Sequence, residues 1–186
     1  MKLPEGDEFY EPFLRFRIVK PAAWKFMPPA WSPVAQLKND PDSPEWLAHA
    51  AMPFVTFMQR HESDDHAYPT VQVTARRVLG ELPDNALARQ ILDMQVEHLR
   101  QTWSDLEVIR ATTDAIVAGY RANAIVGDFT MYAEREGEWR TFAVRSRSYL
   151  IMTPGIGFTL GMSSSIDERF YDERDFEKIL GSISIA

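Results

Sequence analysis

Residues 138–162 read EWRTFAVRSRSYLIMTPGIGFTLGM and decide how the chain folds. The stretch holds two runs of strand-forming residues, Glu138–Thr153 and Ile156–Met162, separated only by Pro154-Gly155. Proline and glycine together favour a tight turn, and consecutive strands joined by a tight turn pair antiparallel. The stretch therefore predicts a β-hairpin within an antiparallel sheet.

Other segments extend this sheet in both directions along the chain. Glu136-Gly137 supplies turn chemistry just before the hairpin, and Leu14, Phe16 and Ile18 show the period-2 alternation of a half-buried strand. The other predicted strands are Phe54–Arg60, Thr70–Leu79, Leu106–Thr112 and Ala118–Glu134. We expect one antiparallel sheet of about five to seven strands.

Helices are predicted at three places. Asp84 is a natural N-cap for a helix that runs to about Trp103. Its expected apolar stripe is Leu87, Ile91, Leu92, Met94, Val96 and Leu99, with His98 on or beside it. A last helix opens at Asp172 or Glu173 and runs through Leu180, and a short one is expected from Ser43. The predicted fold class is α+β, an antiparallel β-sheet flanked by helices.

Composition restricts the class of protein. The chain has 186 residues, 45% of them hydrophobic, and a formal charge of −7, which argues against general nucleic-acid binding. It contains no cysteine, and residues 1–11 lack the apolar run of a signal peptide. No apolar stretch is long enough to span a membrane. We expect a single cytoplasmic domain over residues 1–186, with an irregular Pro/Trp-rich segment at 21–53.

No pattern predicts catalytic chemistry, a cofactor or a metal. The polar cluster His61, Glu62, Asp64, Asp65 and His66 matches no zinc spacing and is typical of a solvated hairpin tip. The serines at 163–165 lack both the lysine of a phosphate loop and the Gly-x-Ser-x-Gly elbow. An enzyme would need His61, His66 or His98 to meet carboxylates in one cleft.

Two groups of residues are candidates for binding. Arg145 and Arg147 share one face of a predicted strand, as do Arg15 and Arg17 of another, and Arg121 is expected on a neighbouring strand. Adjoining faces would form an anion-binding patch, whereas arginines that each pair with an acid would form a solvated face. Trp24, Trp31 and Trp46, in the Pro/Trp-rich segment, would either contact a partner or plug the ends of the sheet.

The two ends of the chain resemble the PsbP-like superfamily. The first strand and its exit, residues 16–24 (FRIVKPAAW), are similar to that family's strand–Pro–x–x–Trp opening. Residues 146–150 and 158–160, followed by 176–183 (FEKILGSI), resemble its closing hairpin and helix. The resemblance implies an α/β/α sandwich. It also implies a non-catalytic role, because the family's photosystem II, Ran-binding, DcrB-like and secretion-chaperone members share no catalytic site and mostly bind other macromolecules.

Two functions are weighed on these grounds. The first is a bacterial protein-interaction or adaptor module, for example a secretion-associated chaperone, with another protein as its partner. It predicts an exposed apolar patch on a sheet face or around Trp24 to Trp46. The alternative is a small-anion or small-ligand binder, which predicts that Arg15, Arg17, Arg145 and Arg147 converge on one cleft.

Overall fold

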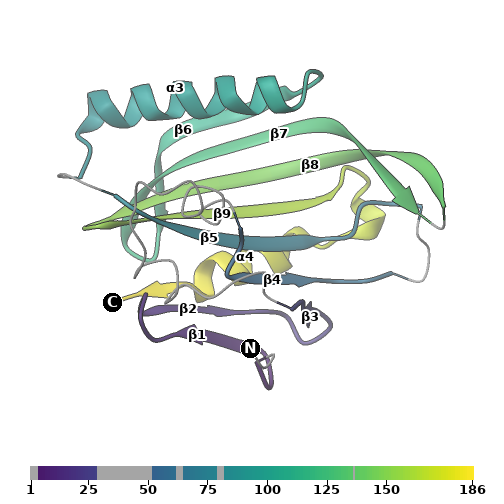
Figure 1. Cartoon of the computed structure of the whole chain (residues 1–186), viewed down its shortest axis with the longest axis horizontal. Helices are drawn as coiled ribbons and strands as arrows, with labels where there is room; N and C mark the ends of the chain where they lie inside the picture. Colours follow the sequence, from purple (N-terminus) through teal and green to yellow (C-terminus); the bar gives the residue numbers. More distant parts are fainter. Residues whose placement is uncertain (1–3, 29–51, 62–64, 79–81, 136) are drawn as a thin grey trace.

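A seven-stranded antiparallel sheet forms the centre of the computed structural model, and a three-stranded sheet lies beside it (Figure 1). The structure describes residues 4–28, 52–61, 65–78, 82–135 and 137–186. The strand order is β3-β4-β5-β9-β8-β7-β6 in the large sheet and β1-β2-β10 in the small one. The elements are β1 (Glu8–Glu11), β2 (Phe16–Val19), β3 (Lys25–Phe26), β4 (Val55–Met58), β5 (Thr70–Arg77), α3 (Asn85–Thr102), β6 (Glu107–Val117), β7 (Tyr120–Arg135), β8 (Glu138–Thr153), β9 (Ile156–Ser165), the 3-10 helix η1 (Glu168–Phe170), α4 (Glu173–Ser182) and β10 (Ser184–Ile185).

Strands β6 to β9 form a continuous meander whose turns follow from local chemistry. The hairpin predicted around Pro154-Gly155 is confirmed, with Thr153 opposite Ile156. The predicted boundary between β6 and β7 was wrong. The sequence suggested that β6 ends at Thr112 and β7 begins at Ala118, whereas β6 runs on to Val117 and Ala118-Gly119 make the turn. Their φ angles are 52° and 81°. Two successive positive φ values give a two-residue loop the twist that antiparallel strands require.

The two faces of the large sheet are covered differently. Helix α3 lies over β6 and β7 on one face, whereas α4 and the small sheet lie on the other (Figure 1). Phe16 and Ile18 of β2 and Phe176 of α4 pack there against Ile151 and Phe158 in the main hydrophobic core. The structure is thus α+β as predicted, but sheet-dominated. One face is covered by a helix, but the other is covered by a helix together with a second sheet. The predicted sandwich of a sheet between helices is therefore confirmed only in part.

Helix α3 begins where the sequence predicts, and its packed face matches the expected apolar stripe only in part. The Asp84 side chain accepts a hydrogen bond from the Leu87 N–H at 2.8 Å, which caps the helix. The buried residues are Ala88 and Leu92, whereas Met94 is 71% exposed. His98 is also exposed, so of the two predicted positions it lies beside the buried stripe and not on it. Alanine was overlooked as a core residue because its side chain contributes little hydrophobicity.

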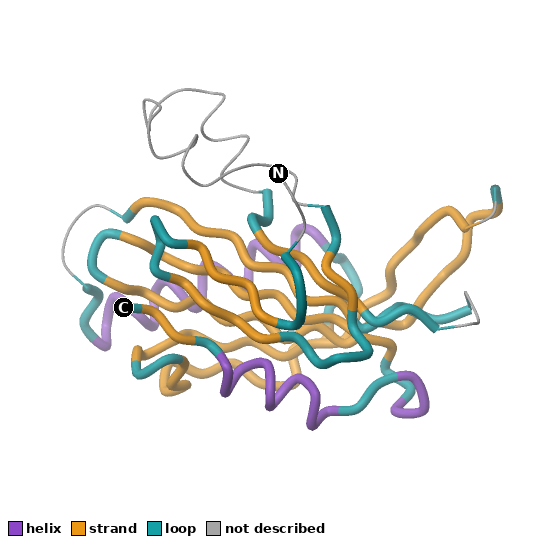
Figure 2. Tube along the Cα trace, turned by 90° about the horizontal axis from the view of Figure 1, so that it is seen from below, coloured by secondary structure: helices purple, strands orange, loops and turns teal. Residues whose placement is uncertain are grey.

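The β7–β8 hairpin extends beyond both of its neighbours. Strand β6 pairs with β7 only as far as Asp128, and β9 pairs with β8 only as far as Val144. Residues 129–135 and 138–143, called the arm below, therefore have no third strand beside them in the described part of the chain and project from the sheet (Figure 2). The Ala143 carbonyl accepts a hydrogen bond from the Ile166 N–H at 3.2 Å, and Arg140 forms an ion pair with Asp65. The base of the arm is held by Asp105, whose Oδ2 accepts a hydrogen bond from the Thr130 N–H at 2.9 Å.

Two predicted features fall partly or wholly outside the described residues. They are the short helix from Ser43 and most of the Pro/Trp-rich segment at 21–53, including Trp31 and Trp46. None of the helices in the described ranges is long and apolar enough to cross a membrane.

Candidate functional site: an arginine-lined cleft

A cleft of about 690 Å³ opens on the sheet face that carries α4. One wall is the face of β6, β7 and β8, and the other is the segment from Glu168 to Arg174, which includes η1 and the first turn of α4. Four arginines line the cleft: Arg110, Arg145, Arg147 and Arg174. They come from three different elements, so the site exists only in the folded chain.

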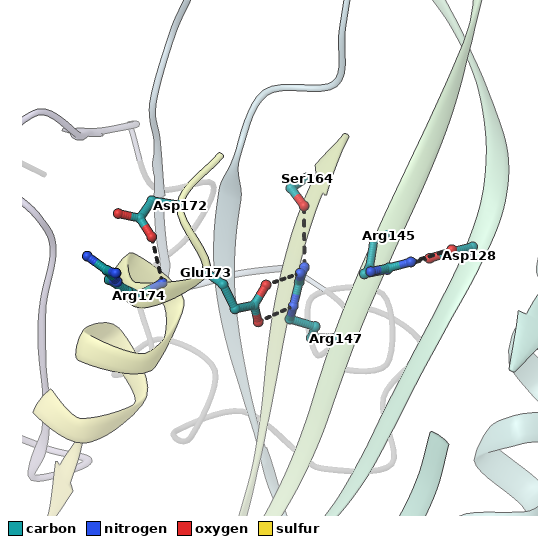
Figure 3. A network of polar contacts seen from close by, with 7 residues as sticks. All are labelled: Asp128, Arg145, Arg147, Ser164, Asp172, Glu173 and Arg174. Carbon is teal, nitrogen blue, oxygen red and sulfur yellow. Dashed lines mark hydrogen bonds and ion pairs between the residues drawn. The ribbon is translucent and has the colours of Figure 1, made fainter. Parts of the chain in front are cut away.

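Arg147 fastens α4 to the sheet. Its Nε donates to Glu173 Oε1 at 2.9 Å, its Nη2 donates to Glu173 Oε2, and its Nη1 donates to Ser164 Oγ at 3.3 Å (Figure 3). The guanidinium also lies over the Tyr171 and Phe176 rings, 5.3 and 4.7 Å from their centroids. Its side chain is 5% exposed. These contacts leave Arg147 a structural clamp, because a bound anion would have to displace Glu173.

Arg145 is paired in a similar way but is closer to solvent. Its Nε and Nη2 donate to the two carboxylate oxygens of Asp128, both at 2.8 Å (Figure 3). The hydrogen bonds that Arg145 donates to the Asp128 carboxylate raise the pKa of Arg145 above its ordinary value, against the opposing effect of burial. Both side chains are about 30% exposed. Arg145 is therefore a permanent cation whose donors are largely committed within the sheet.

Arg110 and Arg174 are the cations that remain available in the cleft. Both are exposed, and neither forms an ion pair with any other residue in the described part of the chain. Arg174 lies in the first turn of α4, where its backbone N–H donates to the capping carboxylate of Asp172 at 2.9 Å (Figure 3). Its guanidinium is left free for another acceptor.

The floor of the cleft carries one further polar group. Burial raises the pKa of the Tyr149 phenol, and the charges of Arg110 and Arg147 limit that rise. The phenol is therefore protonated at neutral pH and offers a hydroxyl at the bottom of the cleft. Glu168, Asp172 and Glu173 also line the cleft, so its overall charge is nearly balanced.

Exposed apolar side chains lie in the cleft and, on the same sheet face, in the arm. Ile109 lines the cleft and is 52% exposed. The strand register places Tyr132 opposite Thr141 and Trp139 opposite Glu134, on the same sheet face as Arg145. Tyr132 and Trp139 are 70% and 74% exposed. We call Ile109, Arg110, Tyr132, Trp139 and Arg174 the cleft–arm surface.

The structure separates the four arginines singled out from the sequence. Arg145 and Arg147 share the cleft, whereas Arg15 and Arg17 lie at the start of β2 in the small sheet and do not line it. Arg17 is exposed and forms an ion pair with Glu8 of β1. The four residues therefore do not converge on one site. Arg121 lies on the opposite face of the sheet, near the start of α3.

Trp24 belongs to the core. It is 2% exposed, and its ring packs edge-on against Phe57 and Phe176, with centroids 5.8 and 5.7 Å away. Its Nε1 donates to Asp175 Oδ2 at 3.3 Å. The ring therefore presents no surface to a partner, which agrees with the alternative that it plugs the sheet. Trp31 and Trp46 lie outside the described residues.

The histidines from the sequence do not assemble a reactive site in the described residues. His66 stacks on Phe170 of η1, and His61 lies near the same ring. No group of three His, Cys, Asp or Glu side chains in the described ranges is placed to hold a metal ion. Of the serines at 163–165, Ser164 serves as the acceptor for Arg147.

Sequence reasoning missed Arg110, Arg174 and the aromatic residues of the arm. The arginines are isolated in the sequence and become neighbours only when α4 returns to the sheet. The arm did leave a signal, because the runs assigned to β7 and β8 are far longer than the run assigned to β9. Strands that outrun their neighbours must project from the sheet, and aromatic residues beside their turn are then exposed.

Comparison with known proteins relates the fold to solved structures. No protein-family model and no curated protein matches the chain. The chain is similar to cyanobacterial PsbP from Synechocystis sp. PCC 6803, with 12% identity over 98% of this chain and 95% of that one and a TM-score of 0.57. It is also similar to LpqN of Mycobacterium tuberculosis, which is involved in cell envelope biogenesis, with 15% identity over 98% and 86% of the chains and a TM-score of 0.53. The resemblance predicted from the two ends of the sequence is confirmed at the level of the fold, and the chain has a PsbP-like fold.

Proposed function

We propose that the protein is a non-catalytic protein-interaction module that binds a partner polypeptide on the cleft–arm surface. The observation that carries the proposal is the coincidence, on one sheet face, of two unpaired arginines with three large exposed apolar side chains. Tryptophan, tyrosine and arginine are the residues most enriched where binding energy concentrates. Contiguous exposed apolar surface beside a polar rim is typical of partner sites.

The chemistry of the surface indicates the kind of segment that would fit. Arg110 and Arg174 favour an acidic side chain or a terminal carboxylate, because a guanidinium binds carboxylates through paired hydrogen bonds. Ile109, next to Arg110, favours an apolar side chain beside that acid. Beyond the bonds at Thr130 and Ala143, the arm has strand edges that no other described strand pairs, and an extended backbone would add there by hydrogen bonding. An acidic, partly apolar and extended segment satisfies all three features.

A role as an adaptor or secretion-associated chaperone in a bacterium falls within this proposal. It is supported by the shape of the surface, which offers a site for an unfolded or extended segment. The similar structure of a protein involved in cell envelope biogenesis adds support of a weaker kind, because it rests on fold alone.

The test is site-specific photocrosslinking in the source organism. A photoreactive phenylalanine analogue replaces Ile109, Tyr132 or, as a matched control, Met94, which is 71% exposed on the opposite face. We expect one discrete adduct from positions 109 and 132 that is absent from position 94. Arg110→Glu with Arg174→Glu should abolish it, whereas Arg100→Glu on α3 should not. Equal adducts at all three positions, or none, would contradict the proposal.

The small-anion alternative is favoured by the same two arginines and has a separate test. Titration with citrate or inorganic phosphate should give saturable heat only if Arg110 and Arg174 form a small-ligand site. We expect weak or no binding, because Glu168, Asp172 and Glu173 line the same cleft and repel a multiply charged anion. If the anion bound tightly and substitution of both arginines abolished that binding, the ligand of the cleft would be a small anion and not a polypeptide.

A further inference from the structure

A second, smaller cavity lies under the N-terminal half of α3, on the sheet face opposite the cleft. Its volume is about 320 Å³, at the lower end of the range for small-molecule sites. Ala88 and Ile91 of α3 form its roof, and Leu150 and Met152 of β8 form its floor. These walls are apolar, so water inside the cavity would have few partners.

One polar side chain in the cavity wall has a fixed orientation. Asn123 of β7 is 7% exposed, and its Nδ2 donates to the Ala88 carbonyl at 3.1 Å and to Gln95 Oε1 at 3.3 Å. The Ala88 carbonyl is only an acceptor, so the amide cannot be turned the other way without losing this bond. The Oδ1 atom therefore points away from the helix backbone.

The Oδ1 atom of Asn123 is an acceptor without a donor. It takes no hydrogen bond from any described residue, and it is not sealed in protein either. Among the described residues, only the Nε2 atom of His61 is a fully buried side-chain polar atom without a partner. Because Asn123 lines the cavity, the accessible side of Oδ1 is the cavity itself. Asn123 therefore presents an oriented acceptor to the cavity, to which a ligand with a hydrogen-bond donor can bind.

The mouth of the cavity is polar. Tyr120 and Arg121 follow the β6–β7 turn and line the entrance, where Arg121 Nη1 donates to Asn85 Oδ1 in the first turn of α3. A ligand would therefore keep its apolar body against Ile91, Leu150 and Met152 and leave any polar end near the guanidinium.

We propose that this cavity binds a small, largely apolar molecule that donates one hydrogen bond to Asn123 Oδ1. The site is independent of the cleft–arm surface, from which the sheet separates it. A hollow with apolar walls and one convergent polar group has the composition typical of a small-molecule site. The ligand class is a compact aromatic or alicyclic compound with a hydroxyl or N–H group.

Indole and 1-benzothiophene make a matched pair of probes for this test, because they share a shape but only indole has an N–H donor. Protein-observed NMR follows the Asn123 side-chain amide and the methyl groups of Leu150 and Met152. We expect saturable shifts at these three residues with indole. Binding of 1-benzothiophene should be about 3- to 10-fold weaker, the factor that one neutral hydrogen bond contributes.

Two variants test whether indole binds in this cavity or in another hollow of the protein. Ile91→Trp fills the cavity and should abolish the indole shifts, with folding checked by circular dichroism. Met131→Trp is the matched control, since Met131 lines a different hollow near Trp103 and should leave indole binding unchanged. Equal affinity for the two probes, shifts centred on Trp103, or no saturable shift in the wild-type protein would each overturn the proposal.

Discussion

Replacing Glu173 by glutamine isolates the contribution of the Arg147 clamp to stability. The substitution keeps the shape of the side chain but removes the charge that neutralises Arg147, whose side chain is 5% exposed. Breaking a fully buried ion pair costs about 3–5 kcal/mol, and a surface pair contributes about 0–1 kcal/mol. Glu173 is 52% exposed, so an intermediate cost of about 2 kcal/mol is expected.

Adding Arg147→Met to Glu173→Gln sharpens this prediction. Methionine removes the stranded charge and keeps an apolar side chain between the Tyr171 and Phe176 rings. Replacing a buried ion pair by apolar groups is often neutral or stabilising. The double variant should therefore recover at least half of the stability that Glu173→Gln loses.

Urea unfolding measures both effects. With a slope of about 2 kcal/mol per molar urea, Glu173→Gln should lower the midpoint by about 1 M. The control is Asp93→Asn, which breaks an exposed pair with Arg89 on α3 and should shift the midpoint by no more than about 0.3 M. If Arg147→Met makes the Glu173→Gln protein still less stable, Arg147 is not a buried charge that needs its partner, and the clamp is refuted.

Three further substitutions and one control variant test packing and charge elsewhere. Gly127→Ala should destabilise by about 1–3 kcal/mol in urea unfolding, because its Cβ would lie 2.9 Å from the Glu107 carbonyl oxygen, whereas Gly161→Ala, with open space at its Cβ, should cost nothing. Arg169→Gln should raise the pKa of Asp167 from about 2 toward its ordinary 3.8, measured by carboxyl ¹³C NMR. A lowered carboxyl pKa stabilises the fold above the ordinary value of 3.8, and this stabilisation is lost as the pH falls toward 2. The wild-type protein should therefore lose stability over this pH range, and the Arg169→Gln variant should lose less. Trp24→Phe should cost about 1–3 kcal/mol by losing core volume and the bond to Asp175, with unchanged crosslinking from position 109.

The strands of the meander were predictable because each ends in its own turn chemistry. Pro154-Gly155 marks one hairpin directly, and the long apolar runs beside it leave little choice of partner. Strands β1, β3 and β10 were missed because none shows a period-2 pattern: β3 and β10 have two residues each, and β1 reads Glu-Phe-Tyr-Glu. They exist because a neighbouring strand or helix positions their backbone, which is information that a local sequence pattern does not contain.

The candidate site was predictable only in part. Alternation placed Arg145 and Arg147 on one face of a strand, and they do share the cleft. Their acidic partners were not foreseeable, because Asp128 comes from β7 and Glu173 from α4, and each pairing depends on how separate elements meet. Arg110 and Arg174 required the full topology for the same reason.

The position of β5 in the sheet has a consequence for how the chain folds. Thr70 of β5 pairs with Ser163 of β9, about half the chain length away, whereas β6 to β9 pair with their immediate successors. Closing so long a loop costs entropy before any contact rewards it, so refolding on the millisecond-to-second scale is expected. Until β5 arrives, β9 is an edge strand whose Phe158, Leu160 and Met162 are all fully buried in the final fold. The newly synthesised protein is therefore most prone to aggregate through β9.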